Sequence, residues 1–204
     1  DLLVDTEEAD SPSNERHELI FSRLNETSKR LNMPVLVGEW GAFSGNTNSN
    51  STPAARFIIS LFERFHFGNT YWAYGEWLPK QRHFTDALVR PYPQFIAGSL
   101  NAYSMTYETG IFSCSWDENP ALTAPTVIYI PDISKLEKGS IKLSPEVSNS
   151  IVQSTEGSNS AYLIIPATCN AIKRTIEFKL NMDQTPIPFE RKPNDLIPKS
   201  KTTN

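Results

Sequence analysis

Two short apolar runs, each preceded by a helix-like segment, set the pattern of the first half of the sequence. Residues 15–31 carry apolar side chains at helical spacing. Val-Leu-Val at residues 35–37 follows, a continuous apolar run typical of a strand buried on both faces. Thr52-Pro53 then begins a second helix, and residues 70–74 form a second strand. This order predicts a parallel α/β unit, whose functional sites collect at the carboxyl ends of the strands.

The second half has a different pattern. Short β-rich runs separated by Pro, Gly, Asn and Ser predict an antiparallel β-sandwich. In one of these runs Phe112, Cys114 and Trp116 alternate as a core face would. The predicted strands cover residues 101–107, 110–116, 126–130, 140–143, 161–165 and 175–180.

The change of composition near Pro93 predicts where one part ends and the next begins. Residues 1–93 are interpreted as the last part of a (β/α)8 barrel, incomplete because so few strands cannot close one. Residues 94–181 are the sandwich, and residues 182–204, rich in Pro and Lys, are a flexible tail. Residues 1–5 read as the end of a strand, so we expect the chain to be a fragment of a longer protein.

Charge and motif content exclude several classes of function. The net charge of -4 offers no basic field for a nucleic acid, and no apolar run is long enough to span a bilayer. No cluster has metal-site spacing and no glycine-rich phosphate loop appears, so we expect neither a metal nor a cofactor. If the protein is secreted, Cys114 and Cys169 should lie close enough to bridge; two buried thiols are the alternative.

Glu39 is the first candidate for chemistry. It follows the buried run and is flanked by Gly38, Trp40 and Gly41. Aromatic faces pack on sugar rings and glycine permits close approach, so this setting suits a site that holds a sugar. From the residues alone, a glutamate in a solvated loop or an ion pair fits equally well.

A family resemblance separates these readings. Residues 33–41, Met-Pro-Val-Leu-Val-Gly-Glu-Trp-Gly, resemble the seventh strand of glycoside hydrolase family 5 barrels, in which the glutamate is the nucleophile. Residues 71–74, Tyr-Trp-Ala-Tyr, resemble strand eight, whose tryptophan forms a platform under the sugar. The resemblance therefore implies a nucleophile at Glu39 and a sugar platform at Trp72, with Trp40 beside them. An ordinary core aromatic is the alternative role for Trp72.

The linker narrows the resemblance to endoglycoceramidases. Residues 89–98 contain an Arg-Pro-Tyr-Pro segment similar to the one that joins barrel and sandwich in those enzymes, and residues 123–131 resemble one of their sandwich strands. The resemblance implies hydrolysis of the bond between a sugar chain and ceramide, or of sterol glucosides. It also implies a glycolipid or oligosaccharide as the partner, a transient contact with a membrane surface, no obligate protein partner and a secreted or lysosome-like location.

The chain departs from the family pattern in one respect. A retaining reaction needs a second carboxyl group, and no Asn-Glu-Pro-like segment precedes Glu39. Glu76, just past the second strand, is the other carboxylate near the same edge. Three alternative roles are open for Glu76: it is the acid/base, it lines the aglycone side of the site beside Trp77, or it lies in a solvated loop without a function.

Two histidines are weaker candidates for a functional role. His66 lies at a helix end and is expected to be structural. His83 lies in a loop, and nothing in the sequence supports its contact with a substrate.

The alternative to an enzyme is a sandwich that binds a carbohydrate or lipid through Tyr103, Tyr107 and Trp116. A purely structural sandwich is a third possibility.

Overall fold

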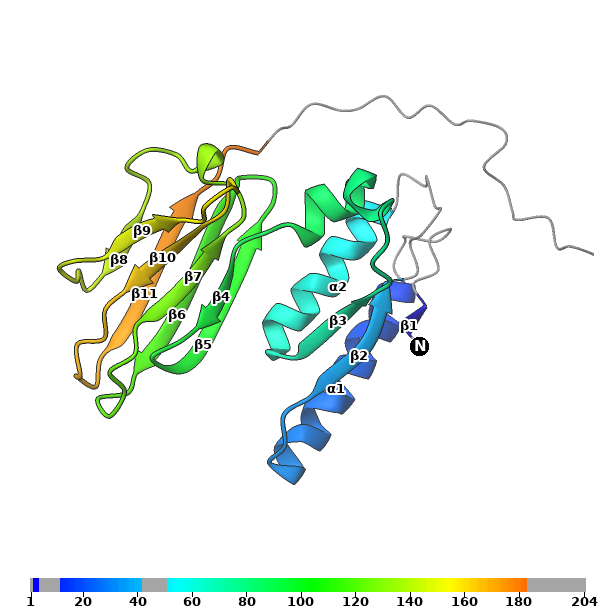
Figure 1. Ribbon diagram of the computed structural model, residues 1–204. Helices are drawn as coiled ribbons and strands as arrows, with labels where there is room; N and C mark the ends of the chain where they lie inside the picture. Colours follow the sequence, from blue (N-terminus) through cyan, green and yellow to red (C-terminus); the bar gives the residue numbers. More distant parts are fainter. Residues whose placement is uncertain (1, 4–11, 42–50, 183–204) are drawn as a thin grey trace, which may run out of the picture.

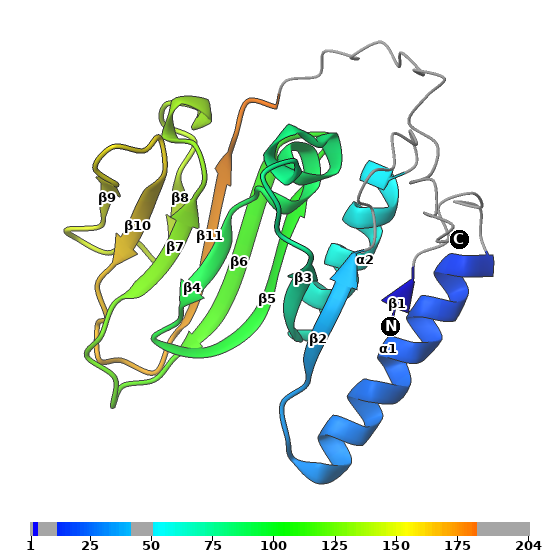
Figure 2. The same cartoon turned by 45° about the vertical axis from the view of Figure 1, so that its right-hand side comes forward.

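The computed structural model describes residues 2–3, 12–41 and 51–182 of the chain. Two units lie side by side, an α/β unit and a β-sandwich (Figure 1, Figure 2). The predicted fold class, a parallel α/β part followed by an antiparallel sandwich, is confirmed. The predicted tail at residues 182–204 lies, except for Met182, outside the described residues.

The α/β unit combines three strands with two helices. Its elements are β1 (Leu2–Leu3), α1 (Pro12–Leu31), β2 (Leu36–Gly41), α2 (Ser51–Phe65) and β3 (Gly68–Trp72). The strands form one sheet in the order β1-β2-β3, and β2 is parallel to both neighbours. Among the described helices, none is long and apolar enough to cross a membrane.

Aromatic side chains join the two helices to one face of this sheet. Phe21 of α1 meets Phe62 of α2 edge to face, with ring centroids 5.2 Å apart. Trp40 of β2 packs on the same Phe62, also at 5.2 Å between centroids. Each such pair adds about 0.5–1.5 kcal/mol beyond the area it buries. The apolar stripe of α2 therefore faces the sheet, as its spacing predicted.

The opposite face of the sheet is open in the described part of the chain. Leu36 is 70% exposed and Trp72 is 61% exposed, whereas Val37, the neighbour of Leu36, packs into the helix-side core. The prediction that the strand at residues 35–37 is buried on both faces is therefore wrong for the described part of the chain. The helices cover one face only, and successive side chains of a strand point to opposite faces.

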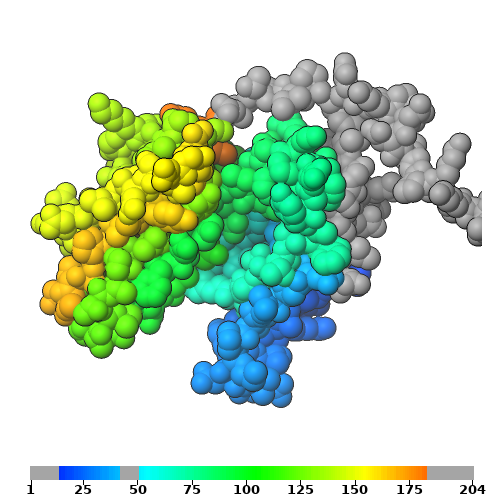
Figure 3. Space-filling view, in the orientation of Figure 1, coloured from blue at the N-terminus to red at the C-terminus, as the bar shows by residue number. Residues whose placement is uncertain are grey.

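The sandwich consists of two four-stranded sheets. Its strands are β4 (Tyr92–Phe95), β5 (Gly98–Thr106), β6 (Ile111–Glu118), β7 (Thr126–Ile130), β8 (Lys142–Ser144), β9 (Ile151–Ser154), β10 (Ala161–Ile165) and β11 (Lys173–Lys179). One sheet has the order β4-β7-β10-β9 and the other β5-β6-β11-β8. The sandwich meets the α/β unit where β5 contacts α2, at the green and cyan segments of the space-filling view (Figure 3).

All six predicted sandwich strands are present, and two further strands escaped prediction. β4 contains Pro93 and a register irregularity, which are features of an edge strand. β9 is exposed at all four residues, so it lacks the alternation that marks a half-buried strand. Both lie at the edges of the same sheet, where hydrophobic patterning is weakest.

Strand β6 confirms the predicted core face, and the cysteines behave differently from expectation. Phe112, Cys114 and Trp116 are buried between the sheets. Cys114 and Cys169 are both free, so the expected disulfide is wrong. The reason is their placement, since Cys114 points into the core whereas Cys169 is exposed after β10. Burial raises the pKa of the Cys114 thiol to about 12, which keeps it protonated.

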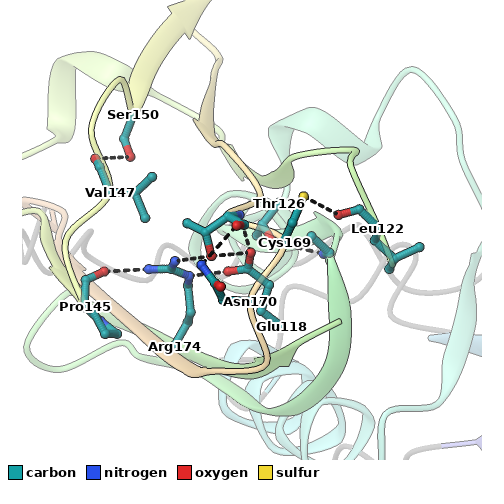
Figure 4. Close-up of polar contacts among 11 residues, drawn as sticks. Glu118, Leu122, Thr126, Pro145, Val147, Ser150, Cys169, Asn170 and Arg174 are labelled. Carbon is teal, nitrogen blue, oxygen red and sulfur yellow. Dashed lines mark hydrogen bonds and ion pairs between the residues drawn. The ribbon is translucent and has the colours of Figure 1, made fainter. Parts of the chain in front are cut away.

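A buried ion pair ties the end of β6 to the start of β11 (Figure 4). Arg174 Nε donates to Glu118 Oε2 at 2.5 Å, and each side chain is 1% exposed. Arg174 also donates to the Pro145 carbonyl at 2.7 Å, and the Thr168 hydroxyl donates to Glu118 at 2.8 Å. Burial alone would raise the pKa of Glu118, but the hydrogen bonds from Arg174 and Thr168 outweigh it and hold that pKa below its usual value.

We predict that Glu118→Gln lowers the free energy of unfolding by about 3–5 kcal/mol at neutral pH, because it leaves the Arg174 charge buried without its partner. The contribution of Glu118 is present above its unfolded pKa of 4.5 and is lost as the pH falls through its lower folded pKa. Urea unfolding at pH 7 and at steps down to about pH 3 measures this. The difference between wild type and variant should shrink toward acid.

The exposed pair Lys142–Glu177, with 3.5 Å between Nζ and Oε1, supplies the control. Glu177→Gln should change the free energy of unfolding by less than about 1 kcal/mol. Equal losses for Glu118→Gln and Glu177→Gln would contradict a special role for the buried pair.

We predict a second stability effect at the turn between β5 and β6. Gly110 has a φ of 72°, and a Cβ there would collide with the Leu180 carbonyl oxygen. Gly157 has a similar φ of 69° but open space around it. Gly157→Ala should therefore cost only backbone strain, on the order of 1 kcal/mol, and Gly110→Ala clearly more. Thermal unfolding of the two variants compares them, and equal melting temperatures would refute the clash.

Candidate active site

The candidate site lies at the carboxyl ends of β2 and β3. These strands are adjacent and parallel, with Trp40 opposite Tyr71 and Gly41 opposite Trp72. The register shifts between Val37 and Trp40, so that β2 carries an extra residue there. Such a bulge re-aims side chains and is common beside functional sites.

The two faces of these strand ends differ in their exposure. Trp40 and Tyr71 turn toward the helices, and the flanking residues Glu39 and Trp72 are exposed. Because neighbouring side chains of a strand point to opposite faces, Glu39 and Trp72 belong to the open face of the sheet. A carboxylate and an indole thus lie at one end of two paired strands.

Trp40 requires a correction, because the sequence suggested that it contacts a sugar. Its side chain is 4% exposed and packs against Phe62 and Tyr71. Its Nε1 donates to Asn69 Oδ1 at 2.9 Å, which satisfies the indole within the core. We therefore assign Trp40 a packing role on the helix side of the sheet.

Beneath Trp72, a tyrosine and a histidine form a pair that the sequence did not predict. Tyr71 Oη and His83 Nε2 are 2.8 Å apart, and His83 is 1% exposed. Burial raises the pKa of Tyr71 to about 12 and lowers the pKa of His83. Both groups are therefore neutral near pH 7. The sequence shows an aromatic residue at position 71 of the strand, but no spacing rule connects it to a histidine twelve residues later, which begins a helical turn and does not lie in the expected loop.

Glu76 lies in the turn that follows β3, at the same end of the sheet. It is exposed, whereas its neighbour Trp77 is half-buried. The short helical turns η1 (Leu78–Lys80) and η2 (Phe84–Leu88) come next and lead back toward α2. Glu76 is thus placed near the open edge by the chain, on a turn and not on a strand.

A set of contacts from α2 and the sandwich holds the segment after β3. Arg90 Nε donates to Glu63 Oε1 of α2 at 2.7 Å, with the two side chains 14% and 4% exposed. Arg56 Nε donates to the Asp86 carbonyl at 3.1 Å, and the Tyr107 hydroxyl donates to the Ala87 carbonyl at 2.9 Å. The Arg56 guanidinium also lies 4.4 Å from the centroid of the Tyr107 ring.

These contacts correct the ligand-binding residues expected in the sandwich. Trp116 is 1% exposed in the core between the sheets. Tyr107 bonds to Ala87, and the Tyr103 ring stacks on His66 with 6.2 Å between centroids. The three aromatic side chains therefore serve the core and the junction with the α/β unit. His66 has a structural role there, as expected.

Within residues 2–3, 12–41 and 51–182, no group of three or more His, Cys, Asp or Glu is arranged to hold a metal ion. The chemistry that the described residues offer is that of a carboxylate and an exposed aromatic ring at the ends of adjacent strands.

Comparison with known proteins relates this arrangement to one enzyme class. The endoglycoceramidase II structure from Rhodococcus sp. with a cellobiose-like imidazole aligns with a TM-score of 0.58 and 20% identity. The alignment covers 82% of this chain and 39% of the endoglycoceramidase chain. Cryptococcus neoformans sterylglucosidase 1 aligns with a TM-score of 0.56 and 15% identity over 80% of this chain and 32% of its own. The chain thus spans about two fifths or less of the length of these structures. No curated protein sequence matches it.

The sandwich provides the family evidence. Residues 90–180 match the sequence model of the glycoside hydrolase family 5 C-terminal domain, beginning at the arginine of the Arg-Pro-Tyr-Pro segment. The solved structures show the same fold over most of the chain. The resemblance found in the sequence is confirmed: residues 90–180 match the C-terminal domain of glycoside hydrolase family 5, and the chain shares its fold with the endoglycoceramidase and sterylglucosidase structures over most of its length.

Proposed function

We propose that this chain is part of a retaining glycosidase that acts on glycolipids, with Glu39 as its nucleophile. The observation that carries the proposal is that Glu39 and Trp72 are both exposed at the carboxyl ends of two paired parallel strands. The family 5 domain that follows in the chain supports it. The carboxyl ends of parallel strands are where barrel enzymes assemble their sites.

In the proposed reaction, a Glu39 oxygen attacks the anomeric carbon and the bond to the aglycone oxygen breaks. A second carboxyl group protonates that oxygen and later activates the water that releases the sugar. The two carboxyl groups of retaining enzymes lie about 5–5.5 Å apart. We propose that the acid/base comes from a segment outside these 204 residues, and that Glu76 lines the aglycone side.

Trp72 would support the sugar ring next to the cleaved bond. Its indole is 61% exposed at the end of β3, so its face is open to a ligand. Tyr71, its neighbour in the strand, is held in the opposite layer by its contacts with Trp40 and His83. Because Tyr71 is held by these contacts, the end of β3 that carries Trp72 is held in place as well.

The proposed substrate class follows from the relatives. One endoglycoceramidase II structure is a ganglioside GM3 complex, with a TM-score of 0.57 and 19% identity, and the other enzyme is a sterylglucosidase. We therefore propose a sugar linked to ceramide or a sterol as the substrate. Such a substrate implies contact with a membrane surface and an extracellular or lysosome-like location.

We predict that a 2-deoxy-2-fluoroglucoside with a good leaving group labels Glu39 in the full-length protein, because the fluorine slows release of the glycosyl-enzyme. Peptide mass spectrometry locates the label. Glu39→Gln should abolish labelling and lower turnover of a fluorescent glucosylceramide about 10,000-fold or more. Glu76→Gln is the matched control, and in this variant Glu39 should still be labelled.

Two outcomes would contradict this assignment. Full activity of Glu39→Gln, or label on another carboxylate, would remove Glu39 as nucleophile. Robust turnover by the 204-residue chain alone would show that the acid/base lies within it, and would promote Glu76 to that role.

We predict that Trp72→Ala lowers kcat/KM for the same glucosylceramide by about 10- to 100-fold, because the sugar loses its aromatic support. Trp72→Phe, which keeps a ring, should fall between the variant and wild type. Leu19→Ala, at a half-exposed position of α1, should leave kcat/KM unchanged. If Trp72→Ala matched wild type, the indole would have no contact with the substrate.

A further inference from the structure

The outer faces of the two sandwich sheets differ in chemistry. On the β5-β6-β11-β8 sheet, the residues that alternate with the core are mostly polar, among them Ser113, Ser115, Thr175 and Glu177. On the β4-β7-β10-β9 sheet, the corresponding positions are mostly aromatic and aliphatic. A solvated sheet face normally carries polar side chains, so the second sheet is the exception.

Three tyrosines cross this second sheet in one row. Tyr92 of β4 is paired with Tyr129 of β7, and Tyr129 is paired with Tyr162 of β10. The ring centroids are 5.1 Å apart in the first pair and 5.7 Å apart in the second. Gln153 of β9 is paired with Tyr162 and extends the row by an exposed amide. Hydroxyl and amide groups therefore accompany the ring faces along the row.

An apolar row runs beside the tyrosines. Phe95 is paired with Val127, Val127 with Ile164 and Ile164 with Ile151. Phe95 is 44% exposed and Ile151 is 53% exposed. The two rows together form a platform, which we call the tyrosine platform after its first row.

Charge is absent from the strands that carry this platform. The sequences Tyr-Pro-Gln-Phe, Thr-Val-Ile-Tyr-Ile, Ile-Val-Gln-Ser and Ala-Tyr-Leu-Ile-Ile of β4, β7, β9 and β10 contain no Asp, Glu, Lys or Arg. In the opposite sheet, strand β11 by itself has four charged residues, the buried Arg174 and the outward-facing Lys173, Glu177 and Lys179. An uncharged surface complements an uncharged ligand, because a charged one would lose hydration without gaining a counter-charge.

We propose that the tyrosine platform binds a neutral saccharide chain. Sugar rings present apolar C–H faces to aromatic rings and hydroxyl groups to polar side chains, and the row of tyrosines and Gln153 offers both. The rings are tilted to one another by 38° and 54°, so they form a twisted strip and not a plane. A strip of this shape fits the successive rings of a soluble chain better than a flat polysaccharide surface.

This site differs from the sandwich residues that the sequence suggested, and it does not depend on Glu39. Tyr103, Tyr107 and Trp116 lie in the junction and the core, whereas the platform lies on the outer face of the other sheet. Binding there would give the protein a second contact with the glycan of a substrate, or with a glycan that is not cleaved.

Isothermal titration of the full-length protein with cellohexaose tests the proposal. All variants carry Trp72→Ala, so that binding at the proposed active site is weakened and the failure of one proposal is separated from that of the other. Tyr129→Ala, at the centre of the row, should weaken binding about ten-fold, and Tyr129→Phe should retain most of it. Tyr92→Ala, on the edge strand, provides a second test if Tyr129→Ala folds poorly.

Ser113→Ala, on the polar outer face of the opposite sheet, is the matched control and should bind cellohexaose as tightly as the protein that carries Trp72→Ala alone. Equal affinity of the Trp72→Ala protein with and without Tyr129→Ala or Tyr92→Ala would overturn the proposal. The absence of any cellohexaose binding by the Trp72→Ala protein would overturn it as well. Binding of phosphatidylcholine vesicles but not of cellohexaose, lost on Tyr129→Ala, would also overturn it and assign the platform to a lipid surface.

Discussion

The ion pair between Glu63 and Arg90 holds the two parts of this protein in one arrangement. Burial raises the pKa of Glu63, and the Arg90 guanidinium opposes that effect by favouring the charged carboxylate. A buried pair of charges tolerates little displacement, because each partner loses its compensation when the other moves. Arg90 begins the linker to the sandwich, and Glu63 belongs to the helix that covers the candidate strand ends. The orientation of the sandwich is therefore coupled to the layer that supports the site.

Most of the architecture could be predicted because apolar residues recur at the spacing of a helix or a strand wherever one face of that element is buried. The helical stripe of α2 and the alternation in β6 are direct consequences of burying one face, so both were predictable. The edge strands β4 and β9 bury little and left no pattern. The free thiols show the same limit, since the number of cysteines says nothing of where the fold directs Cys114 and Cys169.

The sequence predicted which residues form the candidate site, but not the contacts that hold those residues in place. Glu39 and Trp72 were identified by a motif and by their position after apolar runs. The packing of Trp40, the pairing of Tyr71 with His83 and the bulge in β2 depend on contacts between elements that are far apart in the sequence. Local spacing contains no information about such contacts, so only the folded chain reveals them.

The bulge in β2 makes the length of this segment as important as its composition. Gly38 and Glu39 together oppose a single residue of β3, while the pairing on either side is regular. Loss of one residue here would leave a single residue between Val37 and Trp40, which both face the helices, and would restore an unbroken ladder. The side chain before Trp40 would stay on the open face, but without the bulge its position and angle there would change. The placement of the Glu39 carboxylate therefore depends on the number of residues between Val37 and Trp40 as well as on their identity.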